Sequence, residues 1–148
     1  MVKGLRRFFQ APLSKKLFFL KTLCVSFLVR FLIFGLPFRW VKHLLNLNLC
    51  PPETIEPRYE MVKTGAGRTV LNMINTVHRY FPWKNTCLVQ AITGKILLKQ
   101  RAVKCIIVMG LKKDGTETLK AHAWLVNTEG VITGFDEKQE FTEVAYLS

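Results

Sequence analysis

Apolar residues recur at helical spacing in the middle of the chain. Within residues 67–81 the run GRTVLNMINTVHRYF places Val70, Ile74 and Val77 three or four positions apart. This spacing puts them on one face of a helix, and Pro82 cannot continue that helix. The pattern therefore predicts an amphipathic helix that ends just before residue 82.

A second helix is predicted from residue 87 onward. Asn85 and Thr86 are residue types that cap helix N-termini, and the apolar run CLVQAITGKILL follows them directly. Gly94 within this run would let another backbone approach closely. Cys87 is consequently expected in the first turn, where backbone N–H groups have no partner inside the helix.

The spacing of the apolar residues changes from helical to alternating after residue 100. The segment AVKCIIVMGL (102–111) is rich in β-branched residues, and Asp-Gly at 114–115 is a strong hairpin signal. Residues 119–126 and 131–136 predict two further strands. Two helices followed by a three-stranded antiparallel meander make an α+β fold.

The loop of the second hairpin decides which side chains face each other. His122 and Trp124 point to the same face of their strand. A three-residue loop, 128–130, places glycine where a type I turn with a bulge needs a left-handed residue. In that register Trp124 faces Gly134 and His122 faces Asp136. We favour this register because of the glycine.

Two other loop lengths remain open. A two-residue loop at 129–130 would bring Glu137 opposite His122, where it could still orient the ring. A four-residue loop would bring Phe135 opposite His122 and remove the carboxylate. The identity of the orienting carboxylate therefore depends on the loop.

Cys87, His122 and Asp136 have the composition of a nucleophilic site. A carboxylate that holds one imidazole nitrogen leaves the other free to exchange a proton, and an adjacent imidazolium can lower a thiol pKa to about 3–4. The helix N-terminus adds roughly 0.3–1 kcal/mol in favour of the thiolate. The candidate catalytic residues are thus Cys87 as nucleophile, His122 as base and acid, and Asp136 as orienting group. The alternative interpretation of Cys87 is a small buried residue.

The other cysteines and histidines lack such an arrangement. Cys105 lies among aliphatic residues of a predicted strand, and Cys24 and Cys50 have no histidine arranged near them. His43 and His78 are interpreted as partly buried helix residues. The chain has no CxxC motif and no His/Cys cluster at zinc-ligand spacing, so no metal or cofactor is predicted. Free thiols in a reducing compartment are the expected state.

Positive charge is concentrated in the N-terminal third of the chain. Residues 1–52 hold nine Lys/Arg and no acidic residue, whereas the rest holds thirteen Lys/Arg against ten Asp/Glu. This third contains a Phe- and Leu-rich segment, 17–38, which Lys21 and Arg30 interrupt. Membrane span, signal peptide and amphipathic helix are the open interpretations. Nucleic acid binding is disfavoured, because the charges alternate with large aliphatic residues.

These patterns divide the chain into three parts. Residues 1–45 form a basic hydrophobic helical arm, which packs on the body or a partner protein, contacts a membrane surface or spans the membrane. Residues 46–62, with three prolines, are interpreted as a linker. Residues 63–148 form the core.

The core motifs resemble the leader peptidase of lasso-peptide biosynthesis. They are CL at 87–88 opening a helix, LL at 97–98, VMG at 108–110 and AHAW at 121–124, and the resemblance covers about residues 68–148. That family is the transglutaminase-like "B" cysteine protease of bacterial RiPP gene clusters. The chain departs from it at Val89 and Gln90, where members often carry a basic residue.

The resemblance implies a papain-like Cys–His–Asp triad, made here by Cys87, His122 and Asp136. It also implies a cytoplasmic enzyme, membrane-associated if the arm contacts lipid, that removes the leader from a ribosomally made precursor peptide. A separate ATP-dependent cyclase then acts on the core peptide. This chain has no room for a fused leader-recognition domain, so a separate recognition protein is the expected partner. The rival interpretations are a non-catalytic adaptor of the same fold, which binds a membrane or a partner protein, and a transamidase that uses the same triad.

Overall fold

The helices follow the periodic segments of the sequence. A computed structural model describes residues 12–52, 60–81, 86–114, 118–135 and 140–148. Within these ranges the helices are α2 (Leu13–Gly35), α3 (Phe38–Leu44), α4 (Gly65–Tyr80) and α5 (Cys87–Lys99). Both helices that the core pattern predicted are therefore confirmed, and the arm is helical.

Local sequence explains where the helices begin and end. The Thr86 side chain caps α5 and accepts a hydrogen bond from the Val89 N–H at 3.4 Å. In α4, Val70, Ile74 and Val77 are buried, as their spacing predicted. Gly35 is the last residue of α2, and α3 starts only after the next proline, Pro37.

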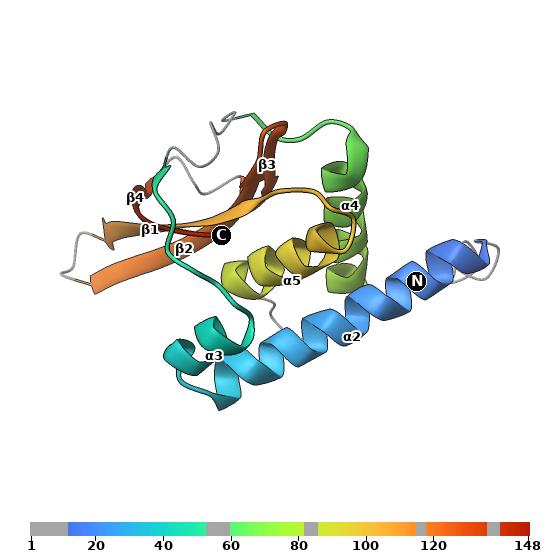
Figure 1. The fold of residues 1–148 in the computed structure, drawn as a ribbon, viewed down its shortest axis with the longest axis horizontal. Helices are drawn as coiled ribbons and strands as arrows, with labels where there is room; N and C mark the ends of the chain where they lie inside the picture. Colours follow the sequence, from blue (N-terminus) through green and yellow to red (C-terminus); the bar gives the residue numbers. More distant parts are fainter. Residues whose placement is uncertain (1–11, 53–59, 82–85, 115–117, 136–139) are drawn as a thin grey trace.

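The sheet has one strand more than the sequence predicted. Its strands are β1 (Ile106–Asp114), β2 (Thr118–Asn127), β3 (Gly130–Thr133) and β4 (Thr142–Leu147). They pair antiparallel in the order β3-β2-β1-β4 (Figure 1). The expected three-stranded meander omits β4, which pairs with β1 at the edge. Only Leu147 of β4 is fully buried, so the strand has a weak alternating pattern.

The turn between β2 and β3 differs from the expected three-residue loop. Asn127 pairs with Gly130, which leaves a two-residue loop, 128–129. The Asn127 side-chain oxygen accepts hydrogen bonds from the N–H groups of Glu129 and Gly130, both at 3.0 Å. This local capping by an asparagine closes the turn without a left-handed glycine in the loop.

An irregularity in the pairing then restores the predicted register. The offset shifts by one residue between Val126, which pairs with Val131, and Leu125, which pairs with Thr133. The Leu125–Thr133 pair belongs to the register that the three-residue loop would have produced. Consistent with it, a Cβ placed on Gly134 would lie 2.9 Å from the Cβ of Trp124.

The segment interpreted as a linker joins the sheet at both of its described ends. Leu49 bridges to Leu147 of β4, and Met61 forms a parallel bridge with Val131 of β3. At the second bridge the Val131 N–H donates to the Glu60 carbonyl at 2.8 Å. These bridges extend both edges of the sheet by one short contact each.

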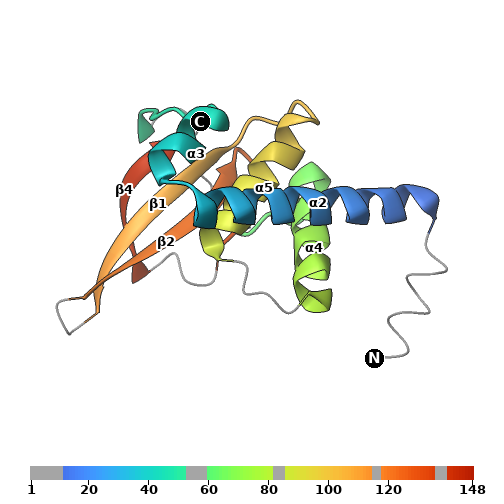
Figure 2. The same cartoon turned by 90° about the horizontal axis from the view of Figure 1, so that it is seen from below.

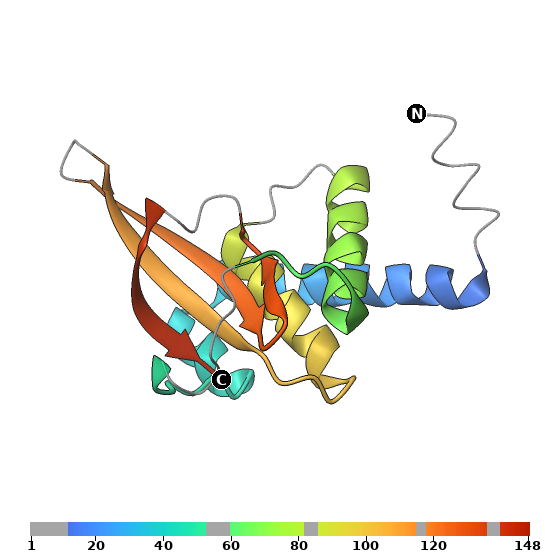
Figure 3. The same cartoon turned by 90° about the horizontal axis from the view of Figure 1, so that it is seen from above.

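The helices cover one face of the sheet. The helix α5 packs against β2, and α4 and α2 pack against α5; Figures 2 and 3 show this arrangement from below and above. One apolar cluster joins Val29 of α2, Ile92 of α5 and Leu125 of β2. A smaller cluster on the other side of the sheet surrounds Trp124. The N-terminal helix α2 thus shares its core with the rest of the fold.

Gly130 is expected to be essential for the bridge between Met61 and β3. A Cβ at this position would overlap the Glu60 carbonyl oxygen, and the glycine has a φ of +149°. Gly130→Ala should therefore lower the free energy of unfolding by about 1–3 kcal/mol. Gly35→Ala is the control, because a Cβ there meets nothing within 4 Å. Urea denaturation followed by circular dichroism measures both, and equal stability of the two variants would contradict the expectation.

Candidate active site

Cys87 is the first residue of α5, as the capping pattern predicted. Its backbone N–H lies in the first turn, where a helix provides no internal acceptor. Because α5 packs against β2, this end of the helix reaches the strand at His122 and Ala123, which both make hydrogen bonds with the Cys87 sulfur. The fold thus brings together two residues that are 35 positions apart in the sequence.

Three neighbouring groups contact the His122 ring. Its side chain is buried, with 6% of the residue exposed. The ring packs against Trp124, at a centroid distance of 5.8 Å, and against Phe141, at 5.1 Å. Its Nε2 donates a hydrogen bond to the Gly134 carbonyl oxygen at 3.1 Å. A carbonyl only accepts, so this contact assigns the proton to Nε2 and leaves Nδ1 to exchange a proton with the thiol.

The surroundings of Cys87 favour its thiolate. Partial burial raises the pKa of the thiol, but four effects together lower that pKa below its ordinary value. In decreasing order these are the hydrogen bond from His122, the hydrogen bond from the Ala123 N–H, the positive charge of His122 and the hydrogen bond from the Leu88 N–H. Each of them stabilises negative charge on the sulfur. The pair is therefore suited to form a thiolate–imidazolium ion pair.

The predicted orienting carboxylate lies outside the described residues. This holds for Asp136 and for its alternative, Glu137. Within the described chain, the acceptor for His122 Nε2 is the Gly134 carbonyl. The sequence did not predict this acceptor, since a backbone carbonyl has no side-chain signature. The available signal was Gly134 itself, whose φ of +73° turns the backbone directly after β3.

An open cleft of about 650 Å³ surrounds the pair. It runs between α4 on one side and β2 with the end of β3 on the other. Polar side chains along it include Arg68, Asn75, Thr86 and Gln90, and apolar ones include Leu71 and Ile132. A cleft with this mixed lining can hold an extended peptide next to the thiol.

Gln90 is a polar residue of α5 beside the candidate nucleophile. It lies one turn after Cys87 and lines the same cleft. Its side-chain nitrogen is 3.2 Å from Nε2 of His78. His78, interpreted from the sequence as a structural helix residue, thus has a polar partner beside the cleft.

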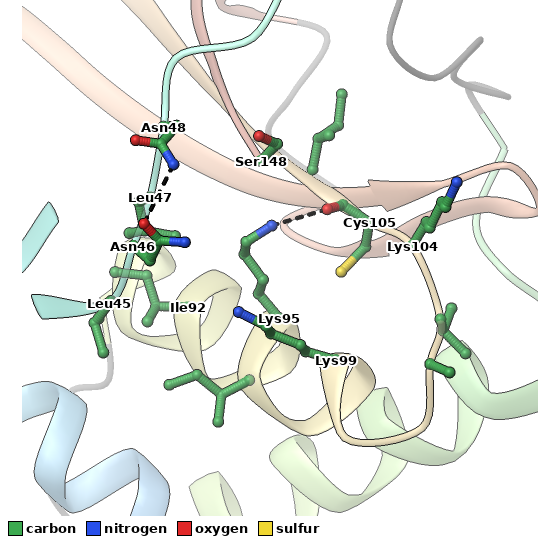
Figure 4. A pocket seen from close by; sticks show the side chains of 14 residues that line it. Leu45, Asn46, Leu47, Asn48, Ile92, Lys95, Lys99, Lys104, Cys105 and Ser148 are labelled. Carbon is green, nitrogen blue, oxygen red and sulfur yellow. Dashed lines mark hydrogen bonds between the residues drawn. The ribbon is translucent and has the colours of Figure 1, made fainter. Parts of the chain in front are cut away.

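A second cleft, of about 500 Å³, lies near the other end of α5. Figure 4 shows Lys95, Lys99 and Lys104 around it, with Cys105 in its wall. Burial raises the pKa of the Cys105 thiol, although the charge of Lys95 partly opposes this. Its lining residues include no histidine, so Cys105 is a core residue, as its apolar surroundings predicted. Among the described residues no group of three or more His, Cys, Asp or Glu could hold a metal ion.

Comparison with known proteins identifies the family. The profile of the transglutaminase-like superfamily matches residues 25–146. The chain belongs to the transglutaminase-like superfamily. This superfamily includes cysteine peptidases and transamidases and consists typically of cysteine-dependent enzymes. No curated protein and no solved structure matches the chain.

The superfamily match covers all of the elements that build the site. It begins within α2 and ends near the end of β4, so it includes α5 and the β2–β3 hairpin. The α+β architecture expected from the sequence is confirmed as that of a transglutaminase-like domain. In this domain Cys87 and His122 are the described thiol–imidazole pair.

The lowered pKa of Cys87 predicts selective alkylation. Iodoacetamide should label Cys87 in the folded protein at a lower pH than in the denatured chain, because only the thiolate reacts. His122→Gln should move the labelling midpoint upward, since burial without the imidazolium disfavours the thiolate. Peptide mass spectrometry against pH measures this. Cys105 is the internal control and should remain unlabelled. An unchanged midpoint in His122→Gln would show that the pair is not coupled.

Proposed function

We propose that the protein is a cysteine peptidase that removes the leader from a ribosomally made precursor peptide. The observation that carries the proposal is the Cys87–His122 pair at the N-terminus of α5, beside an open cleft. A thiol whose pKa is lowered by a buried imidazole is a nucleophile at neutral pH. Its environment contrasts with that of Cys105, whose thiol pKa is raised.

The first half of the reaction forms a thioester. The Cys87 thiolate attacks the carbonyl carbon of the scissile peptide bond, and the carbonyl oxygen becomes an oxyanion. The Cys87 N–H, free of a helical acceptor, can donate to that oxygen. His122 then gives its proton to the leaving amine as the C–N bond breaks. The peptide carrying the new N-terminus leaves, and the leader stays on the sulfur as an acyl group.

The second half releases the leader. Neutral His122 takes a proton from water, and the resulting hydroxide attacks the thioester carbonyl. The C–S bond breaks, and the thiolate and the imidazolium are restored as the leader leaves with a free carboxylate. The hydrogen bond from Nε2 to Gly134 keeps the ring in one orientation through both halves.

The substrate class rests on the sequence motifs. The CL pair at 87–88 and AHAW at 121–124 resemble the lasso-peptide leader peptidases, and both motifs line or adjoin the cleft. In this assignment the substrate is a lasso precursor, and a separate protein recognises the leader. The ATP-dependent cyclase then uses the amino terminus that cleavage sets free. A precursor gene, a recognition protein gene and a cyclase gene beside this gene would support the assignment.

Replacement of Cys87 should abolish cleavage. We expect the cleavage rate of Cys87→Ala to fall at least about 1,000-fold, since the proposed acyl intermediate forms on the Cys87 sulfur. Cys24→Ala is the matched control, because Cys24 is exposed on α2 and should be dispensable. The precursor encoded nearby, with its recognition protein, is the substrate, and mass spectrometry follows the products. Undiminished cleavage by Cys87→Ala would refute the peptidase assignment and favour a non-catalytic adaptor.

The same assay separates peptidase from transamidase. Cleavage in ¹⁸O-labelled water should place the heavy oxygen in the new carboxylate of the leader. A transamidase would instead join that carbonyl to an added amine, with no incorporation of oxygen from water.

Asp136 stays the proposed orienting carboxylate. The register at Leu125–Thr133 is the one from which this assignment was made. Asp136→Asn should therefore slow cleavage more than Glu137→Gln, because loss of the negative charge destabilises the imidazolium. The ratio of the two kcat/KM values is the measurement. If both variants cleave like the parent, the Gly134 carbonyl alone suffices to orient the ring.

A further inference from the structure

The outer surface of α2 is apolar, which is unusual for a helix on the surface of a domain. Large side chains more than half exposed line it: Leu13, Leu17, Leu20, Phe27, Leu28, Phe31 and Phe34. The residues of α2 that are buried are Thr22, Ser26 and Val29. The inner side of the helix therefore packs against the domain with these small side chains and with the partly buried Phe18, Val25 and Ile33, whereas the large exposed side chains named above face outward.

These exposed side chains form one continuous stripe. At about 100° per residue, they fall within about 120° of the helix circumference. Thr22, Ser26 and Val29 lie on the opposite side. Inside the domain the Thr22 hydroxyl donates to the Phe18 carbonyl at 2.8 Å, so its polarity is satisfied within the helix.

Basic side chains flank the stripe. Lys21 lies at one border and Lys16 and Arg30 at the other by the same angular count. The Arg30 guanidinium is 4.7 Å from the centre of the Phe34 ring. This arrangement, an apolar stripe between cationic borders, is that of helices that lie in the plane of a membrane surface.

The neighbouring helix α3 also exposes large apolar residues next to basic ones. Its exposed large residues are Phe38, Trp40 and Leu44. Arg39 and Lys42 are interspersed among them. Tryptophan is favoured at the level of lipid headgroups, where its ring is partly in the apolar region and its N–H is in a polar one. Residues 1–52 hold nine Lys/Arg and no acidic side chain, which is complementary to anionic lipid.

The packing of α2 favours a position on the membrane rather than across it. By length and composition α2 could span a bilayer. However, it packs against α5 and α4 of the catalytic domain. A span would have to separate these helices or carry α5, with its own core contacts, into the hydrocarbon. A helix lying in the interface keeps both its inner contacts and its outer apolar stripe.

We propose that the outward face of α2 and α3 binds the surface of a membrane that contains anionic lipids. The described residues that line the catalytic cleft include none from α2 or α3. Lipid contact through this face therefore leaves the cleft clear for a peptide. The proposal is independent of the catalytic assignment, and Cys87→Ala should bind membranes like the parent protein.

Flotation of the full-length protein with vesicles tests the proposal. We expect binding to phosphatidylcholine vesicles that contain phosphatidylglycerol, and much weaker binding to phosphatidylcholine alone. Leu17→Gln with Phe31→Gln should reduce binding at least about ten-fold, because both side chains lie in the middle of the stripe. Lys21→Gln and Arg39→Gln should each reduce binding to the anionic vesicles about five-fold. High salt should weaken binding of the parent protein.

Matched controls lie on the β1–β2 hairpin, which projects away from the helices (Figure 1). Leu119→Gln and Lys113→Gln replace an exposed apolar and an exposed basic residue there, and both should bind vesicles like the parent. Circular dichroism checks that each variant is folded. Absence of vesicle binding, or equal binding to neutral and anionic vesicles, would overturn the proposal. So would a dimer in analytical ultracentrifugation that the Leu17/Phe31 double variant converts to monomer, because the face would then bind a second copy.

Discussion

The close approach of α5 to β2 is the constraint on which the site depends. A Cβ on Gly94 would lie 2.7 Å from Cδ2 of Leu125, so only glycine leaves room for that leucine. The sequence indicated a close approach at Gly94, and the structure shows that a side chain rather than a backbone fills the space. With the helix held at this distance, its first residue meets β2 at His122 and Ala123. A wider separation would leave the thiol without the two hydrogen bonds that most lower its pKa.

The imidazole depends on a second set of close contacts. Trp124 stacks against His122 and occupies space that a Cβ on Gly110 or Gly134 would fill, at 2.8 and 2.9 Å respectively. The two glycines thus allow the large aromatic side chain to lie beside the ring. Gly134 has an additional role, because its carbonyl accepts from Nε2. One residue therefore makes room for the packing and provides the acceptor that fixes the tautomer.

The sequence predicted local structure well and long-range contacts in part. Thr86 and the apolar period placed Cys87 at a helix start because capping and burial are local effects. The face shared by His122 and Trp124 followed from strand alternation. The predicted length of the β2–β3 loop was wrong, because the Asn127 side chain closes a shorter turn. The predicted register returns only through an irregularity in the pairing that no residue type indicates. The edge strand β4 and the bridges of Leu49 and Met61 are contacts between distant segments, which periodicity within a segment does not encode.

The helix α2 also shows that the pattern within a segment does not determine what that segment contacts. Its sequence contains a polar stripe with Thr22 and Ser26 and an apolar remainder, and such a pattern normally puts the polar side in water. In this fold the small polar residues face the domain together with Phe18 and Ile33, and the large exposed Phe and Leu side chains face outward. Periodicity identifies the two faces of a helix but not what each face meets. That second assignment requires the partner, which for the inner face is α5 together with α4 and for the outer face is, in our proposal, the surface of a membrane.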